Sequence, residues 1–158
     1  MSNVILQEDG TAIDRILAHA ERIRNGLERV RPGDPYEIST AAMAGEGVWQ
    51  GDLGLEIVEA IPPSHQLVEK LTEKDRQLVF GNTEGARHCI EDLSTVQLYK
   101  DPSWNEEDLF GPSFICLEKT TITHPTHGPV IIPKDFIIHT RYQRSQDAEE
   151  QRIRRARD

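Results

Sequence analysis

Two histidines separated by Pro125 and Thr126 are the residues of this chain best placed to do chemistry. They occur in the stretch THPTHGPVIIP, residues 123–133, where an apolar segment follows the second histidine. Proline suits the first central position of a type I or II turn. His124 and His127 can then face one another at the start of a hairpin, with Cβ atoms about 4.5 to 5.5 Å apart. Two such imidazoles are half of a metal site, because Zn²⁺ and related ions take three or more protein ligands.

The remaining ligands of such a site must come from elsewhere in the chain. His88 and His139 are the available imidazoles, and the alternatives are Cys89, Glu84 and Glu91. Side chains alternate along a strand, so His88 and Cys89 cannot both point inward without a bulge. The competing interpretation is that the turn histidines lie on the surface and that His139 is a structural residue of a strand. We expect His19 and His65 to be exposed to solvent.

Other kinds of site have little support in the sequence. The glycine pair in GNTEG, residues 81–85, lacks the Lys-Ser/Thr and the helix that follow a phosphate-binding loop. No serine lies in a nucleophile elbow, and neither cysteine has the histidine and carboxylate neighbours of a thiol nucleophile. The acidic run 106–108 could bind a cation, although a solvated loop is the favoured interpretation. Nucleophilic catalysis is therefore not expected.

Composition limits the class of protein. A chain of 158 residues with 37% hydrophobic content fits one domain with a real core. No apolar run approaches the roughly 20 residues of a membrane span, and the N-terminus lacks the pattern of a secretory signal. We therefore expect a cytoplasmic protein with no membrane contact and with Cys89 and Cys116 reduced. The net charge of −9 argues against nucleic-acid binding.

The hydrophobic pattern predicts an N-terminal helix followed by a β domain. Apolar residues recur at three- and four-residue steps over residues 11–31, which indicates an amphipathic helix that ends at Pro32-Gly33. We predict that residues 1–35 pack on the core, with homo-oligomerisation through the helix as the alternative. Short segments rich in β-branched and aromatic residues then fill residues 36–144, which predicts a small antiparallel barrel or sandwich.

The C-terminal segment, residues 145–158, is predicted to be a charged tail that is helical or disordered. Together with Arg144 it holds five of the 18 basic residues, the others being Arg152, Arg154, Arg155 and Arg157. Nucleic acid is therefore expected as a partner only through this tail.

Three segments resemble a little-characterised family of small bacterial and phage β proteins. They are VWQGDLGLEIVEAIPP, LVFGNTEGARHCI and THPTHGPVIIPKDFIIHTRYQR. Members of that family show a QGD strand, a G-H-x-H segment and a T-H-x-x-H-x-P-I-x-L-P segment. The resemblance implies that His88, His124 and His127 form one cluster, similar to the histidine clusters of cupin-like barrels. This chain has Ala86 where the family places the first histidine of G-H-x-H, so a four-histidine site would be reduced to three here or completed by His139 or a carboxylate.

The leading hypothesis is a small cytoplasmic β-barrel protein that binds a divalent metal (Zn, Fe, Mn or Ni) at His88, His124, His127 and His139. With an open position the ion could activate water or, as iron, dioxygen, with Glu84 or Glu91 as a base. The reaction itself stays unnamed.

Two alternatives come from other classes of protein. In the first, the protein is a non-enzymatic interaction or assembly module. Its histidines stabilise the turn, and its helix binds a second copy or a protein partner. In the second, the basic tail contacts RNA.

Overall fold

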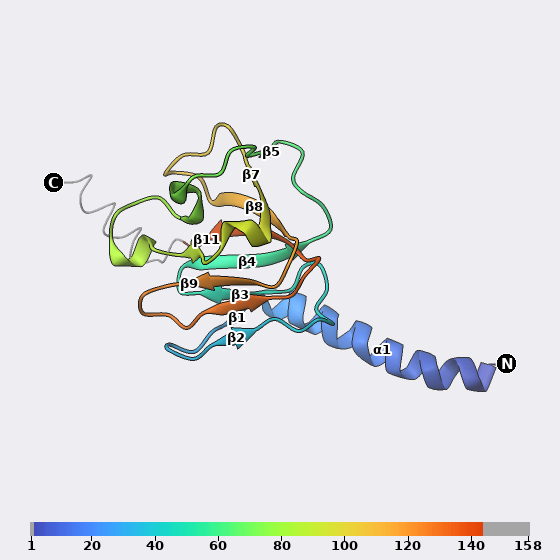
Figure 1. The fold of residues 1–158 in the computed structure, drawn as a ribbon. Coiled ribbons are helices and arrows are strands. Elements are labelled where there is room, and N and C mark those ends of the chain that lie inside the picture. The colour runs from blue at the N-terminus through green and yellow to red at the C-terminus, as the bar shows by residue number, and fades with distance from the viewer. Residues whose placement is uncertain (1, 144–158) are drawn as a thin grey trace, which may run out of the picture.

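Two β-sheets stack face to face in the computed structural model, which describes residues 2–143 and the side chains from residue 12 onward (Figure 1). The sheets do not close into a barrel, so the architecture is an open sandwich. This agrees with the predicted mainly β class and selects the sandwich over the barrel.

The larger sheet has seven strands, and its central strands are antiparallel. Their order is β1 (Glu28–Arg29), β3 (Gly47–Gln50), β4 (Leu53–Val58), β11 (Ile137–Tyr142), β8 (Phe110–Cys116), β7 (Val96–Lys100) and β5 (Gln66–Leu67). In β4 the buried Leu53, Leu55 and Ile57 alternate with residues that point to the other face, as a half-buried strand requires.

The smaller sheet has four strands and carries the turn with the two histidines. Its order is β2 (Tyr36–Glu37), β10 (Val130–Ile132), β9 (Thr120–Thr123) and β6 (Cys89–Ile90). Strands β9 and β10 form a hairpin in which Ile122 pairs with Val130. The stretch 124–129 is therefore the connection of a hairpin, as the proline predicted.

The short segment after the helix contributes one strand to each sheet. Strand β1 pairs with β3, and β2 pairs with β10, both in parallel. The expectation of a purely antiparallel fold is therefore wrong at these two edges. Each is a two-residue strand at the edge of its sheet, and a turn closed by the hydrogen bond from the N–H of Asp34 to the carbonyl of Arg31 separates the two.

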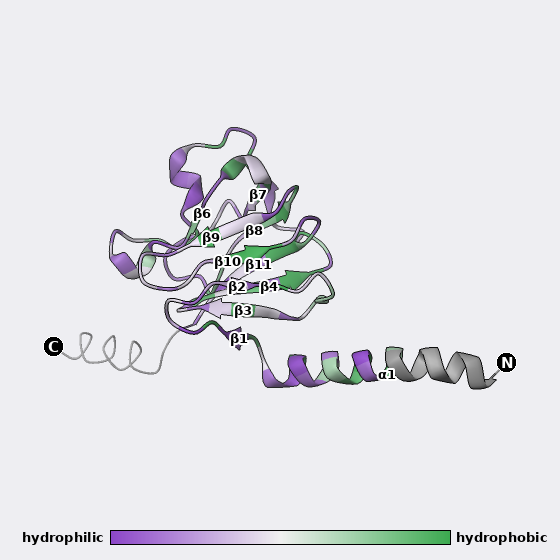
Figure 2. Ribbon diagram, turned by 60° about the horizontal axis from the view of Figure 1, so that its bottom comes forward, coloured by the Kyte–Doolittle hydropathy of each residue, from purple (hydrophilic) through white to green (hydrophobic). Residues whose placement is uncertain are grey.

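Side chains from both sheets meet in one core. Phe114, Leu53, Leu55 and Ile138 of the larger sheet are fully buried, as is Ile122 of the smaller sheet. In Figure 2 the apolar stretches of the strands gather in the β domain.

Helix α1 (Ser2–Asn25) extends away from the sandwich (Figures 1 and 2). It ends earlier than predicted because Gly26 has a φ of +81°, a left-handed conformation that glycine adopts easily at a helix C-terminus. None of its described side chains belongs to the buried core cluster. The prediction that the helix packs on the core is thus not met by the described residues.

Three 3₁₀ helices lie in the connections: η1 (Glu73–Arg76), η2 (Glu84–Ala86) and η3 (Leu93–Thr95). Cys89 and Cys116 are free thiols. No described helix has an apolar stretch long enough to cross a membrane. The predicted C-terminal tail, residues 145–158, lies outside the described residues.

Candidate functional site

Three imidazoles, one of them distant from the other two in sequence, converge beside the β9–β10 hairpin. The ring centroid of His88 lies 4.3 Å from that of His124 and 6.2 Å from that of His127. The centroids of His124 and His127 are 4.6 Å apart. The fold therefore brings together the three histidines that the family resemblance placed in one cluster.

Gln50, the last residue of β3, is at the centre of the hydrogen bonds around this cluster. Its side chain is fully buried, and its Nε2 donates to the backbone carbonyls of Ile122 at 3.0 Å and Gly128 at 2.9 Å. Carbonyls only accept, so the amide nitrogen must face them and Oε1 must face the 2.9 Å contact with Nδ1 of His88. Gln50 thus joins the two sheets through polar groups that would otherwise be buried without partners.

This geometry determines the tautomer of His88. Because Oε1 of Gln50 accepts, Nδ1 of His88 carries the proton and Nε2 keeps a lone pair. The ring is only 1% exposed. Burial, together with the neighbouring His124 and His127, lowers the pKa of His88 to about 3. The ring is therefore neutral at physiological pH.

His124 closes its own turn. Its Nδ1 accepts hydrogen bonds from the backbone N–H groups of Thr126 and His127, both at 3.1 Å. An accepting Nδ1 is unprotonated, so the proton of the neutral ring is on Nε2. Burial and the proximity of His127 lower the pKa of His124. The side chain therefore acts like the asparagine of an Asx turn, in which a side-chain acceptor stabilises the backbone two and three residues later.

His127 packs against the β3–β4 turn. Gly51 has a φ of +59°, and a Cβ atom there would lie 2.4 Å from Nε2 of His127. Both the left-handed backbone and the close approach of the imidazole require glycine at this position. The turn that contains Gly51 and the turn that contains His127 are thereby held together.

The arrangement does not fit a three-histidine metal site. Nδ1 of His124 is occupied by two backbone donors, and its Nε2 carries the proton, so neither nitrogen offers a lone pair to an ion. Within the described part of the chain, no three His, Cys, Asp or Glu side chains are grouped so that they could hold a metal ion. Metal binding stays a prediction of the sequence that this geometry does not support.

His139 lies in another environment. It belongs to β11, where it pairs with Glu56 and Ser113 and points to the face of the larger sheet opposite the core. Its ring centroid is 5.2 Å from that of His65 and 5.1 Å from that of Phe110. Burial lowers its pKa to about 4. It is not in ring contact with the cluster at the hairpin.

The two histidines that were expected to be exposed both have partners. Nδ1 of His65 lies 2.7 Å from Oγ of Ser113, but this serine is fully buried, so its hydroxyl is inaccessible to a substrate. Nδ1 of His19 lies 2.7 Å from Oε2 of Glu46. Neither contact is predictable from local sequence patterns, because the partners are 48 and 27 residues away.

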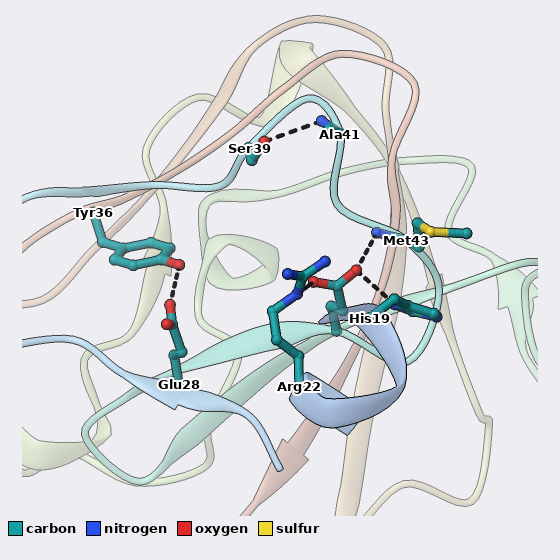
Figure 3. A network of polar contacts seen from close by, with 8 residues as sticks. His19, Arg22, Glu28, Tyr36, Ser39, Ala41 and Met43 are labelled. Carbon is teal, nitrogen blue, oxygen red and sulfur yellow. Dashed lines mark hydrogen bonds and ion pairs between the residues drawn. The ribbon is translucent and has the colours of Figure 1, made fainter. Parts of the chain in front are cut away.

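Glu46 anchors the end of helix α1 to the β domain through His19 and Arg22, two helix residues that Figure 3 labels. Its carboxylate binds His19 and Arg22 of the helix, and it also accepts a hydrogen bond from the backbone N–H of Met43 at 2.9 Å. Burial raises the pKa of Glu46, but the hydrogen bonds from Arg22, Met43 and His19 outweigh this effect and lower it below its usual value. The carboxylate is therefore ionised at neutral pH and holds the helix at a defined angle.

The histidine cluster opens toward two hollows of different character. His88 lines a cleft of about 500 Å³ together with Asp52, Glu106 and Asp108. His124 lines a shallower hollow of about 390 Å³, where Arg76 and Arg87 also contribute. The hollow at His88 is thus lined by carboxylates, whereas the hollow at His124 is lined by two guanidinium groups and the carboxylate of Glu73.

The fold and the cluster define a mainly β sandwich domain with buried, hydrogen-bonded histidines. A family model described as "Domain of unknown function (DUF8820)" matches residues 49–138, which is more than half of the chain. The protein therefore belongs to this family. The matched region contains Gln50 and the three clustered histidines but excludes helix α1. No curated protein and no solved structure matches the chain.

The family match agrees with the predicted little-characterised family. The finer prediction of a cupin-like histidine motif stays a prediction.

Proposed function

We propose that the protein is a non-enzymatic assembly module that associates with a second copy of itself through the apolar stripe of helix α1. The stripe consists of Ile13, Ile16, Leu17, Ala20 and Ile23. The observation that carries the proposal is the exposure of its large residues. Ile13 is 47% exposed, Ile16 59%, Leu17 61% and Ile23 46%.

An amphipathic helix that projects from its domain needs a partner for its apolar face. Helices of this kind gain most of their stability from packing that face, since short isolated helices are marginal in water. Helix α1 touches the domain near its C-terminal end, where Ile23 lies against Gly45 and Glu46 binds the helix. These contacts partly cover Ile23 but leave Ile13, Ile16 and Leu17 exposed, which is typical of an interaction surface.

The spacing of the stripe fits a second copy of the same helix. Ile13, Ile16, Ala20 and Ile23 follow the three-four-three steps of the a and d positions in a coiled coil. Leu17 lies beside this seam and widens it to the broader face used in helical bundles. Because the helix extends beyond the sandwich, two copies can pair their helices while the β domains stay apart (Figure 2).

The hydrogen bonds of the histidine cluster support a structural role rather than a catalytic one. Nδ1 of His88 is bound to Gln50, and Nδ1 of His124 is bound to its own turn. In this proposal the sandwich is a rigid body, and Glu46 orients the helix that it presents.

Sedimentation velocity of the full chain over a wide concentration range tests the proposal. We expect the wild-type protein to associate reversibly. Leu17→Asp should weaken association by more than tenfold, because burying a leucine contributes about 1.5 to 3 kcal/mol. The control is Ala18→Asp, which introduces the same residue on the side of the helix away from the stripe.

Far-UV circular dichroism establishes that both variants keep their helix and sheets. A wild-type protein that is monomeric at every concentration would overturn the proposal. Equal association of the two variants would do so as well, since it would place the interface outside the stripe.

A further inference from the structure

A hollow of about 360 Å³ lies between the end of helix α1 and the β domain, around the residues drawn in Figure 3. Its volume is in the range of small-molecule sites, about 300 to 1,000 Å³. The helix contributes Arg15 and Arg22, which are seven residues apart and therefore lie on one face. Neither residue belongs to the apolar stripe, so the proposed self-association does not use this hollow.

The most deeply buried lining residues are apolar. Ile38 and Val48 are 3% and 1% exposed, and Ala42 packs against the same core cluster. Met43 also lines the hollow, and its side chain is largely open to solvent. A ligand with an apolar body would remove these surfaces from water, which favours binding.

Two guanidinium groups bring hydrogen-bond donors to the hollow. Glu46 accepts from Nε of Arg22 and leaves the two terminal nitrogens of this group available. In Figure 3 these nitrogens point away from the helix, toward the segment that holds Ser39 and Ala41. Arg15 forms no ion pair or hydrogen bond with the residues that the structure describes. Planar guanidinium donors of this kind match a carboxylate.

A carboxylate of the β domain lines the same hollow. Glu28 accepts a hydrogen bond from the hydroxyl of Tyr36, which lies beside it in Figure 3. A carboxylate accepts about four hydrogen bonds, so Glu28 can bind a cationic donor as well. The pKa of Arg22 is raised, mainly by its hydrogen bond to Glu46 and in addition by the charge of Glu28. Donors for an acidic group and an acceptor for a basic group are therefore close together.

The charges of the described lining residues balance. Arg22 and Glu46 pair with each other, which leaves Arg15 and Glu28 as the two charges without an ionic partner in the described part of the chain. A ligand with a single charge is attracted by one of these groups and repelled by the other. A ligand that carries both signs is attracted by both.

We propose that this hollow binds a small zwitterion with an apolar body, which is the chemistry of a free α-amino acid with an apolar side chain. Arg15 and the terminal nitrogens of Arg22 bind the carboxylate, and Glu28 binds the ammonium group. The apolar side chain of the ligand lies against Ile38 and Val48.

Isothermal titration of the full chain with L-phenylalanine tests the proposal. Two analogues each lack one charge, since hydrocinnamate has no ammonium group and phenethylamine has no carboxylate. We expect each analogue to bind at least about tenfold more weakly than L-phenylalanine. The reason is that each loses charge-assisted hydrogen bonds and leaves one charge of the hollow unmatched.

Matched variants assign the two charges. Arg15→Gln should weaken the binding of L-phenylalanine by about tenfold without weakening that of phenethylamine, which has no carboxylate. Glu28→Gln should weaken the binding of L-phenylalanine by about tenfold without weakening that of hydrocinnamate. The controls are Arg24→Gln and Glu21→Gln, which remove exposed charges of helix α1 outside the hollow and should have no effect.

Ala42→Leu tests the apolar part of the site. The larger side chain occupies space that the body of the ligand needs, so it should weaken the binding of L-phenylalanine by more than about threefold. Thermal unfolding of each variant verifies that the fold is intact before affinities are compared. The charge variants change exposed side chains and test the site independently of this core-facing substitution.

Three results would overturn the proposal. One is the absence of L-phenylalanine binding to the wild-type protein at millimolar concentration. Another is equal affinity for L-phenylalanine and its two analogues, since the charges would then contribute nothing. The third is wild-type affinity in both Arg15→Gln and Glu28→Gln, which would place any binding outside this hollow.

Discussion

Nδ1 of His88 donates a hydrogen bond of 2.9 Å to Oε1 of Gln50, across 38 positions of sequence. The same amide donates to the carbonyls of Ile122 and Gly128, on either side of the turn that holds His124 and His127. One glutamine therefore positions one histidine directly and the hairpin of the other two. The cluster behaves as a single hydrogen-bonded unit, and the following predictions test it.

Replacing Gln50 with leucine should lower the free energy of unfolding by about 3 kcal/mol or more. The substitution nearly conserves volume but leaves two carbonyls and one imidazole N–H buried without partners, at about 1 to 3 kcal/mol each. Urea denaturation measures the change. Gln97→Ala, at an exposed position of β7, is the control and should cost less than about 0.5 kcal/mol. Similar losses for the two variants would contradict the central role of Gln50.

The protein should lose stability as the pH falls below about 6.5. The pKa of His88 is about 3 in the folded state and 6.5 in the unfolded chain, so between these values only the unfolded chain binds the proton. The free energy of unfolding should therefore fall by up to about 1.4 kcal/mol per pH unit for this residue. His139, whose pKa is about 4, should add to the slope above pH 4.

Urea denaturation between pH 3 and pH 7 measures this dependence. His88→Gln should flatten the slope over the whole window, and His139→Gln should flatten it in the upper part alone. If the slope of His88→Gln equals that of the wild-type protein, the buried neutral histidine is not the cause.

Divalent metals should leave the stability of tag-free protein unchanged. Nδ1 of His124 is engaged by its own turn, so the three imidazoles do not provide three lone pairs. Thermal unfolding with and without equimolar Zn²⁺ or Ni²⁺ measures the effect. His124→Asn is the informative variant, because Oδ1 of asparagine can accept the same backbone hydrogen bonds without being a histidine ligand.

His124→Asn should keep wild-type stability within about 1 kcal/mol. A rise in the unfolding temperature of the wild-type protein on adding metal, absent in this variant, would restore the metal hypothesis.

Alanine at Gly51 should cost more than alanine at Gly33. Both glycines have positive φ, +59° and +82°, so both substitutions incur the backbone penalty of about 1 to 2 kcal/mol. At Gly33 a Cβ would meet nothing within 4 Å, whereas at Gly51 it would lie 2.4 Å from Nε2 of His127. Gly51→Ala should therefore lower the unfolding free energy by about 1 to 3 kcal/mol more than Gly33→Ala does, and this difference measures the contact with His127. Equal losses would show that His127 moves aside without cost.

Local patterns in the sequence determined the secondary structure and part of the site. The alternation of Leu55 and Ile57 with Glu56 and Val58 predicts a half-buried strand because side chains of a strand point to opposite faces in turn. The apolar steps of Ile13, Ile16 and Ala20 predict a helix for a similar geometric reason. Proline between His124 and His127 predicts their turn. Each of these signals lies within a few residues, where the covalent geometry of the chain fixes the relation between neighbours.

Tertiary structure alone decided which atoms meet. It separates His139 from the three histidines at the hairpin, brings Gln50 to His88, and directs two backbone donors to Nδ1 of His124 rather than leaving that nitrogen for an ion. It also leaves the apolar face of helix α1 exposed, because His19 and Arg22 turn a polar side toward Glu46. These contacts depend on strand order and on packing between residues far apart in sequence, which no local periodicity encodes.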